Sequence, residues 1–190
     1  MKHNGEQRIQ SEQNPKTPVS ITLAGFSKEK TCLFTGHRDL GEDKIVHIVP
    51  RLEIEIDKLI NQGVNTFISG AALGFDFIAS TVIMKKQNIF IETGEGEYVR
   101  HILALPFRDF DRKWPSDKHR AFYREVILPL ADEVIYVSDD YDQDVYRRRN
   151  QFMVDNAAHC LCALMRDKSG TGQTVRMAKK QGLSVINVAE

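Results

Sequence analysis

The sequence predicts an α/β domain of the Rossmann-like, doubly wound type, with a mainly parallel sheet in the middle of three α/β/α layers. Short apolar runs alternate along the chain with segments in which apolar residues recur at helical spacing, which is typical of a parallel sheet covered on both faces. The runs are also continuously apolar, as parallel strands buried on both faces should be. With 190 residues, 42% of them hydrophobic, the chain is suited to a single core.

Six strands and five helices are expected in alternation. The strands are expected at residues 31–36, 64–69, 101–105, 134–137, 160–165 and 184–188. The helices are expected at residues 43–61, 75–86, 117–130, 143–159 and 173–181. Pro50 lies inside the first helical pattern, so a kink or a late helix start is expected near it. The charged, glycine-containing stretch 92–98 is expected to be an exposed loop.

The domain proper is expected at residues 28–190. Residues 1–27 are polar and show little periodicity, so they are expected to be a disordered or loosely packed tail. Within this tail, residues 19–26 could pair as an edge strand.

Composition and charge narrow the class of partner. Lys plus Arg and Asp plus Glu each number 26, so the formal net charge is zero and nothing attracts nucleic acid or anionic membrane in general. No apolar run reaches about 18 residues and no signal-peptide core is present, which predicts a cytoplasmic protein without a membrane partner. Cys32, Cys160 and Cys162 lie in strand-like runs, which favours buried free thiols over a metal site.

Glycine-rich and polar residues follow the first two strands, at the edge where ligands bind in such folds. After the first strand, Gly36 allows close backbone approach and Arg38 can grip a phosphate, although a plain turn is the alternative. His37 between them is a candidate general acid or base. The second strand is followed by small residues and by Asp76, which either caps the next helix or contacts a ribose hydroxyl. The candidate binding residues of this second loop are Ser69, Gly70, Ala71, Gly74 and Asp76.

A second glycine loop follows the fifth strand and leads into a helix, so it is a second plausible anion cradle. Its candidate binding residues are Gly170, Thr171, Gly172 and Thr174. Arg149 lies four residues before Met153 and is expected to point inward, toward the same cleft.

Several other side chains are left with two interpretations. The aromatic residues Phe107, Trp114 and Tyr141 either stack on a base or cover the core. Asp155 is either buried and paired or simply exposed.

From residue 31 to the end, the chain resembles the YpsA-like branch of the SLOG superfamily, which is related to the LOG phosphoribohydrolases and to the DNA-processing protein DprA. The matching positions are residues 34–38 and 68–71, Gly74, Asp76, Pro106, Trp114, Ala131, Asp132, Val137, Ser138, Tyr141, residues 149–155, Gly170, Thr171 and Thr174.

The resemblance implies a domain that binds nucleotides or their derivatives. Enzymatic LOG relatives cleave the N-glycosidic bond of a nucleoside monophosphate, and they use an arginine and a glutamate. Arg149, followed by Asn150, stands at the position of that arginine. Thr174 stands at the position of that glutamate, and its hydroxyl cannot supply the negative charge that stabilises an oxocarbenium-like sugar.

Three functions are therefore weighed. The leading expectation is a sensor or regulatory protein that binds a small phosphorylated nucleotide derivative and requires no cofactor. The second is a phosphoribohydrolase in which Asp76 or Asp155 replaces the missing carboxylate, with Arg149 and Thr174 as further catalytic candidates. DNA binding comes third and is not expected, because the neutral charge opposes it despite the arginines at 147–149. The sequence leaves open whether the chain forms a homo-oligomer.

Overall fold

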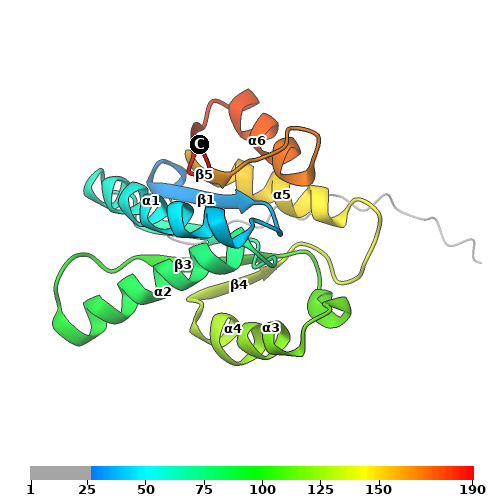
Figure 1. Cartoon of the computed structure of the whole chain (residues 1–190), viewed down its shortest axis with the longest axis horizontal. Helices are drawn as coiled ribbons and strands as arrows, with labels where there is room; N and C mark the ends of the chain where they lie inside the picture. Colours follow the sequence, from blue (N-terminus) through cyan, green and yellow to red (C-terminus); the bar gives the residue numbers. More distant parts are fainter. Residues whose placement is uncertain (1–26) are drawn as a thin grey trace, which may run out of the picture.

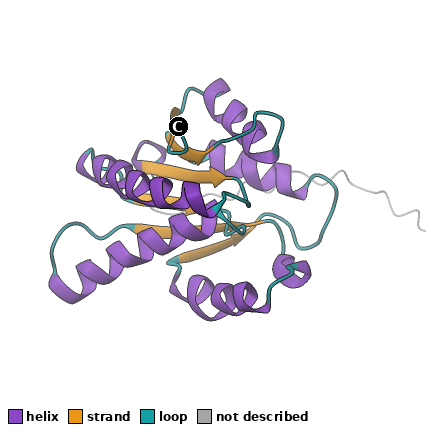
Figure 2. Cartoon of the chain, viewed as in Figure 1, coloured by secondary structure: helices purple, strands orange, loops and turns teal. Residues whose placement is uncertain are grey.

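One sheet of six parallel strands forms the centre of the domain (Figure 2). The structure is a computed structural model that describes residues 27–190, so the expected tail and the edge strand considered at 19–26 lie outside the described residues. The sheet order is β4-β3-β2-β1-β5-β6. The strands are β1 (Thr31–Gly36), β2 (Thr66–Ser69), β3 (Arg100–Leu105), β4 (Glu133–Tyr136), β5 (His159–Ala163) and β6 (Ser184–Asn187). The expected mainly parallel α/β architecture is confirmed.

Helices cover both faces of the sheet (Figure 1). They are α1 (Glu42–Asn61), α2 (Phe75–Thr93), α3 (Asp117–Phe122), α4 (Leu128–Leu130), α5 (Val145–Asp155) and α6 (Gly170–Lys180). Adjacent strand residues face opposite layers. Phe34 and Phe67 pack with α1 and α2, whereas Leu33 and Ile68 pack with α5 and α6. The continuous apolar runs of the sequence thus pack against helices on both faces of the sheet.

The strand order reverses direction at β1. The chain moves outward from β1 to β4, and α5 then carries it back so that β5 pairs with the free side of β1. In Figure 1 the arrowheads of β1 and β4 point to the right, toward the side where the loop between β4 and α5 extends. A crevice is expected where neighbouring parallel strands send their connections to opposite faces, and the β1–β5 boundary is such a place.

Four helices, α1, α2, α5 and α6, differ from the sequence expectation at a boundary. Helix α1 begins at Glu42, so a late start near Pro50 is wrong; Ile48 and Leu52 on either side of the proline are both buried, and this packing holds the helix through it. Helix α2 continues to Thr93, because Gly94 supplies the left-handed cap only there, and the exposed loop is correspondingly shorter. The last helix was expected at residues 173–181 but begins three residues earlier, at Gly170.

That last helix, α6, begins at Gly170 because Ser169 is its N-cap. The Ser169 hydroxyl accepts a hydrogen bond from the N–H of Gly172 at 3.0 Å, which satisfies one of the free donors of the first turn. The predicted glycine loop is therefore largely the first turn of a helix. Helix α5, in contrast, is shorter than expected, because it ends at Asp155 and β5 starts at His159.

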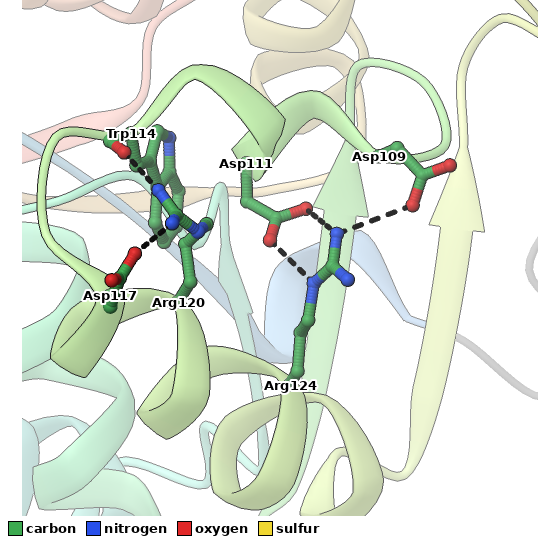
Figure 3. A network of polar contacts seen from close by, with 6 residues as sticks. All are labelled: Asp109, Asp111, Trp114, Asp117, Arg120 and Arg124. Atoms are coloured by element: carbon green, nitrogen blue, oxygen red, sulfur yellow. Dashed lines mark hydrogen bonds and ion pairs between the residues drawn. The ribbon is translucent and has the colours of Figure 1, made fainter.

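The segment between β3 and β4 is held by a polar network (Figure 3). It contains the short helical turn η2 (Phe110–Lys113), α3, a π-helical stretch η3 (Tyr123–Ile127) and α4. The buried carboxylate of Asp111 accepts hydrogen bonds from Arg124 at 2.7 and 3.3 Å. Arg120 donates to the carbonyl of Trp114 and to Asp117. These contacts fix the chain that follows β3.

Candidate functional site

A cavity of about 330 Å³ lies at the carboxyl ends of β1 and β5, where the strand order reverses. The loops after β1, β2 and β5 and one face of α5 form its walls. Of the predicted binding residues, those that line it are Gly36, His37, Arg38, Asp76, Arg149, Asn150, Gly170 and Thr171. The structure therefore brings together residues from four separate stretches of sequence.

Arg149 and Asp76 are the two buried charged groups of this cavity. Arg149 points inward, as its spacing from Met153 predicted, and is 8% exposed; Asp76 is 5% exposed. The Nε and Nη1 atoms of Arg149 have no hydrogen-bond partner among the described residues. A buried donor without a partner costs about 1–3 kcal/mol, and more when it is charged. Arg149 is therefore a buried cation on the cavity wall with two donor atoms that lack a partner among the described residues.

Asp76 does not cap helix α2. Its Oδ2 accepts a hydrogen bond from the N–H of Ala72 at 3.3 Å, in the loop before the helix. Burial raises the pKa of Asp76 from 3.8 to about 6, against the opposing effect of the positive charge of Arg149. Burial likewise lowers the pKa of Arg149, although a guanidinium stays protonated at neutral pH. For both groups desolvation outweighs their mutual attraction, which agrees with the absence of a hydrogen bond between them.

Four predicted binding residues in the loop after β2 support the cavity wall but do not line the cavity: Ser69, Gly70, Ala71 and Gly74. A Cβ atom at Gly70 would lie 1.5 Å from Nη1 of Arg149, so only glycine leaves room for the guanidinium. Gly74 has a φ of 86°, and a Cβ there would lie 2.2 Å from the carbonyl oxygen of Arg38. The Ser69 hydroxyl accepts from the N–H of Ala71 at 3.1 Å and holds the turn. Their binding role stays a prediction, and their visible role is to pack the loop closely.

The first turn of α6 forms the opposite wall. Gly170 and Thr171 line the cavity, and a Cβ at Gly170 would meet nothing within 4 Å, so this position opens toward the cavity. Gly172 faces the other way, and a Cβ there would lie 2.0 Å from the carbonyl oxygen of Asp167. The free N–H groups of a helix N-terminus favour an anion at this place.

Thr174 does not line the cavity. Its side chain is buried, 1% exposed, and its hydroxyl donates to the carbonyl of Gly170 at 3.1 Å. The position that the LOG resemblance assigns to a carboxylate is thus occupied by a hydroxyl that is already hydrogen-bonded within the helix. Asp76 is the carboxylate that the cavity does contain.

His37 joins the loops that follow β1 and β5. Its ring Nε2 accepts a hydrogen bond from the backbone N–H of Arg166 at 3.2 Å, and the backbone N–H of His37 donates to the carbonyl of Ala163. Burial and the positive charge of Arg166 lower the pKa of His37, so its ring is neutral at physiological pH. Its visible function is to position the loop that precedes α6.

The aromatic candidates separate into two groups. Trp114 is buried and packs on Phe77 and Phe110, with ring centroids 5.4 Å apart in each pair, so it belongs to the core. Phe107 instead contacts Tyr141 and also Tyr146, which lines the cavity. Sequence reasoning missed Tyr146. The signal was its helical spacing from two residues that had been singled out, because it lies three positions before Arg149 and four before Asn150.

The remaining candidates lie away from the cavity. Asp155 is exposed at the end of α5, where its Oδ1 accepts from Gln151 and Gln181 at 2.7 Å each, so it cannot replace the missing carboxylate. The three cysteines are free and buried. Within residues 27–190 no group of three or more side chains is arranged to hold a metal ion. No helix in the same range is long and apolar enough to cross a bilayer.

Comparison with known proteins agrees with the fold and the motifs. Residues 21–184 match the model of the YpsA family, described as the YspA SLOG family. The SPbeta prophage-derived protein YoqJ of Bacillus subtilis is 26% identical over 73% of this chain and 80% of its own length. The UPF0398 protein BH1768 of Halalkalibacterium halodurans is 24% identical over 85% of this chain and 80% of its own length.

Two solved structures of DprA share the fold. The protein from Streptococcus pneumoniae superposes with a TM-score of 0.58 at 17% identity, over 83% of this chain. The protein from Helicobacter pylori, described with a single-stranded DNA binding mode, gives 0.54 at 16% identity, over 82%. This chain spans only 50% and 63% of those two chains. The family match covers most of the sequence and confirms the resemblance, so the chain belongs to the YpsA SLOG family.

Proposed function

We propose that the cavity binds a small phosphorylated, nucleotide-derived ligand, and that the protein acts as a sensor or regulatory binding protein. The observation that carries this proposal is the buried Arg149, whose Nε and Nη1 atoms lack partners among the described residues. A phosphate accepts two hydrogen bonds from a guanidinium at once, and such charge-assisted pairs are about twice as strong as neutral ones. Binding would thus satisfy donors that the unliganded protein leaves without partners.

Two further features support an anionic ligand. The N-terminus of α6 borders the same cavity, and its N–H groups and dipole favour a negative charge. Arg38 also lines the cavity, and its positive charge opposes the rise in the pKa of Asp76 that burial causes. The preference for a nucleotide over another phosphorylated compound rests on membership of the SLOG family and on its relation to LOG enzymes and DprA.

The test uses the opening at Gly170. Adenosine, guanosine, cytidine and uridine 5′-monophosphates are added to the wild type and to Gly170→Val, and thermal unfolding is followed. At least one nucleotide should stabilise the wild type, whereas the valine methyls would occupy the cavity and abolish the shift. Because a Cβ at Gly170 meets no atom within 4 Å, the variant should fold normally without ligand. An identical shift in both proteins, or none in the wild type, would contradict the proposal.

Hydrolysis is the second candidate function, and Asp76 is the observation that favours it. A carboxyl group with a pKa of about 6 exchanges its proton near neutral pH, which suits a general acid or base. We expect no appreciable hydrolysis, because Thr174 supplies no carboxylate and Asp76 is the one acidic side chain that lines the cavity within residues 27–190. Chromatography of the four nucleotides after incubation tests this expectation. Release of free base at about one turnover per second would establish an enzyme, and Asp76→Asn would then be inactive.

DNA is the third candidate. Its support is the likeness to a DprA structure described with single-stranded DNA, which weakens the expectation, drawn from net charge, that DNA is not a partner. Binding of both ligands to Gly170→Val distinguishes a shared site from separate sites. If a nucleotide occupies the cavity as proposed, Gly170→Val removes nucleotide binding, and any retention of an oligonucleotide that survives this change must use another surface.

A further inference from the structure

Three aromatic side chains gather beside the cavity. Phe107 follows β3, Tyr141 lies in the loop between β4 and α5, and Tyr146 is in the first turn of α5. Both tyrosine rings pack edge-on against Phe107, with ring centroids 5.8 and 6.3 Å away and interplanar angles of 75° and 74°. Tyr141 is nevertheless 64% exposed and Tyr146 42% exposed. Exposed aromatic surface gathered in one place is a feature of binding sites.

This aromatic cluster is continuous with the anion site. Tyr146, Arg149 and Asn150 all line the cavity from one face of α5. Tyr146 and Arg149 are three residues apart, close to one helical turn, so their side chains are neighbours on the helix surface. A ligand that places its phosphate against Arg149 therefore has an aromatic ring on the same face of α5. Asn150 adds an amide, which can donate to and accept from the edge of a base.

The cluster is held in place before any ligand arrives. The loop that carries Tyr141 is fixed by Asp142, which accepts a hydrogen bond from Arg148 at 2.8 Å and another from the N–H of Asp144 at 2.9 Å. Arg147 pairs with Asp144 at 3.2 Å. Arg148 therefore holds this loop and Arg149 points into the cavity, whereas the pair of Arg147 with Asp144 is exposed and contributes little.

The other side of the cluster is also fixed. Phe107 packs against the core cluster that contains Trp114, and the contacts of Asp111 with Arg124 hold the following turn (Figure 3). Aromatic rings held in this way lose little conformational freedom when they stack on a ligand.

We propose that Tyr146, supported by Phe107 and Tyr141, is the stacking subsite for the nucleobase of a nucleotide whose phosphate lies against Arg149. This inference rests on the proposed function and deepens it, because it requires a base on the ligand. Base–aromatic stacking tolerates any base, since every base has a π-face, so the subsite recognises the presence of a base and Asn150 is left to distinguish among bases.

The experiment compares two ligands that differ only in the base. Calorimetry measures the binding of the best-stabilising nucleoside 5′-monophosphate and of ribose 5-phosphate to the wild type, Tyr146→Leu and Tyr146→Phe. Tyr146→Leu should weaken nucleotide binding by about ten- to a hundredfold and leave ribose 5-phosphate binding unchanged. Tyr146→Phe keeps the ring and should bind both ligands like the wild type. Tyr141→Leu should reduce nucleotide binding in the same direction by a smaller factor.

Each of the other outcomes contradicts the stacking subsite, and one of them also contradicts the proposed function. If the wild type binds ribose 5-phosphate as tightly as the nucleotide, or if Tyr146→Leu leaves nucleotide binding unchanged, stacking is wrong while a phosphate site remains. If Tyr146→Leu weakens both ligands equally, the ring contributes to the sugar or phosphate site and the base subsite is wrong. If the wild type binds neither ligand, the proposed function and the subsite are both wrong.

Discussion

Arg149 and Asp76 form a buried pair of opposite charges that do not hydrogen-bond to one another. Each lies on the wall of the same cavity. For each, the effect of burial on the pKa is larger than the opposing effect of the partner's charge. Groups whose pKa values are shifted by burial and by a charged neighbour in a cleft are typical of functional sites. Here a carboxyl group with a raised pKa lies near a buried guanidinium whose Nε and Nη1 atoms lack partners among the described residues.

The pH dependence of stability reports on Asp76. Its folded pKa of about 6 lies above the unfolded value of 3.8, so the folded state binds more protons between about pH 4 and 6, and Asp76 destabilises it increasingly as the pH rises through this window. Asp76→Asn removes that effect. Relative to the wild type, its free energy of unfolding should therefore rise by up to about 3 kcal/mol between pH 4 and 7.

Urea unfolding of both proteins at several pH values measures this difference. The buried His101 has a pKa lowered to about 4, so it contributes pH dependence of the opposite sign, but it is common to both proteins and cancels. A difference in stability that does not change with pH would show that Asp76 titrates normally.

At the scale of the element, the first turn of α6 uses two glycines for different purposes. Gly172 lies against the backbone of Asp167, whereas Gly170 opens toward the cavity. Gly172→Ala should therefore destabilise the protein by about 1–3 kcal/mol, as overpacking against a fixed backbone does. Gly170→Ala should leave the free energy of unfolding nearly unchanged. Chemical denaturation of the two variants compares them directly, and equal stabilities would contradict this division of roles.

The sequence predicted the parts of the site that depend on local pattern. The glycine loops, Arg149 and Asp76 were recognisable because each lies at a strand end or at helical spacing from an apolar residue. The clearance that Gly70 provides for Arg149 was not predictable, since it is a contact between the loop after β2 and helix α5. Tyr146 was hidden by the arginines that follow it, which looked like a solvated helix start.

At the scale of the whole molecule, the sequence predicted alternating strands and helices but not their spatial order. The return of the chain from β4 to the free side of β1 depends on pairings between β1 and β5, which local periodicity does not encode. That return creates the crevice and brings α5 to it. The topology therefore brings together the residues that line the cavity, and the predicted ones, unlike Tyr146, were recognisable in their own segments.

The balanced charge of the molecule has a measurable consequence. Because the net charge is zero, only local cations should attract the ligand, so the affinity for a nucleoside monophosphate should fall only weakly with salt, with a smaller log–log slope than that of an oligonucleotide. An oligonucleotide that contacts several phosphates would give a slope of about 0.7 per contact. Titrations between low and physiological salt measure both slopes. A steep slope for the mononucleotide would contradict binding at a single local site.

Calorimetry of matched arginine variants tests whether Arg149 binds the phosphate of the ligand. Loss of a charge-assisted contact weakens binding by about 1.5–3 kcal/mol, which equals roughly ten- to a hundredfold in Kd. Arg149→Ala should show this loss for the nucleotide that stabilises the wild type. Arg147→Ala is the control, because that side chain is exposed and pairs with Asp144, and it should bind like the wild type. Wild-type affinity in Arg149→Ala would contradict the claim.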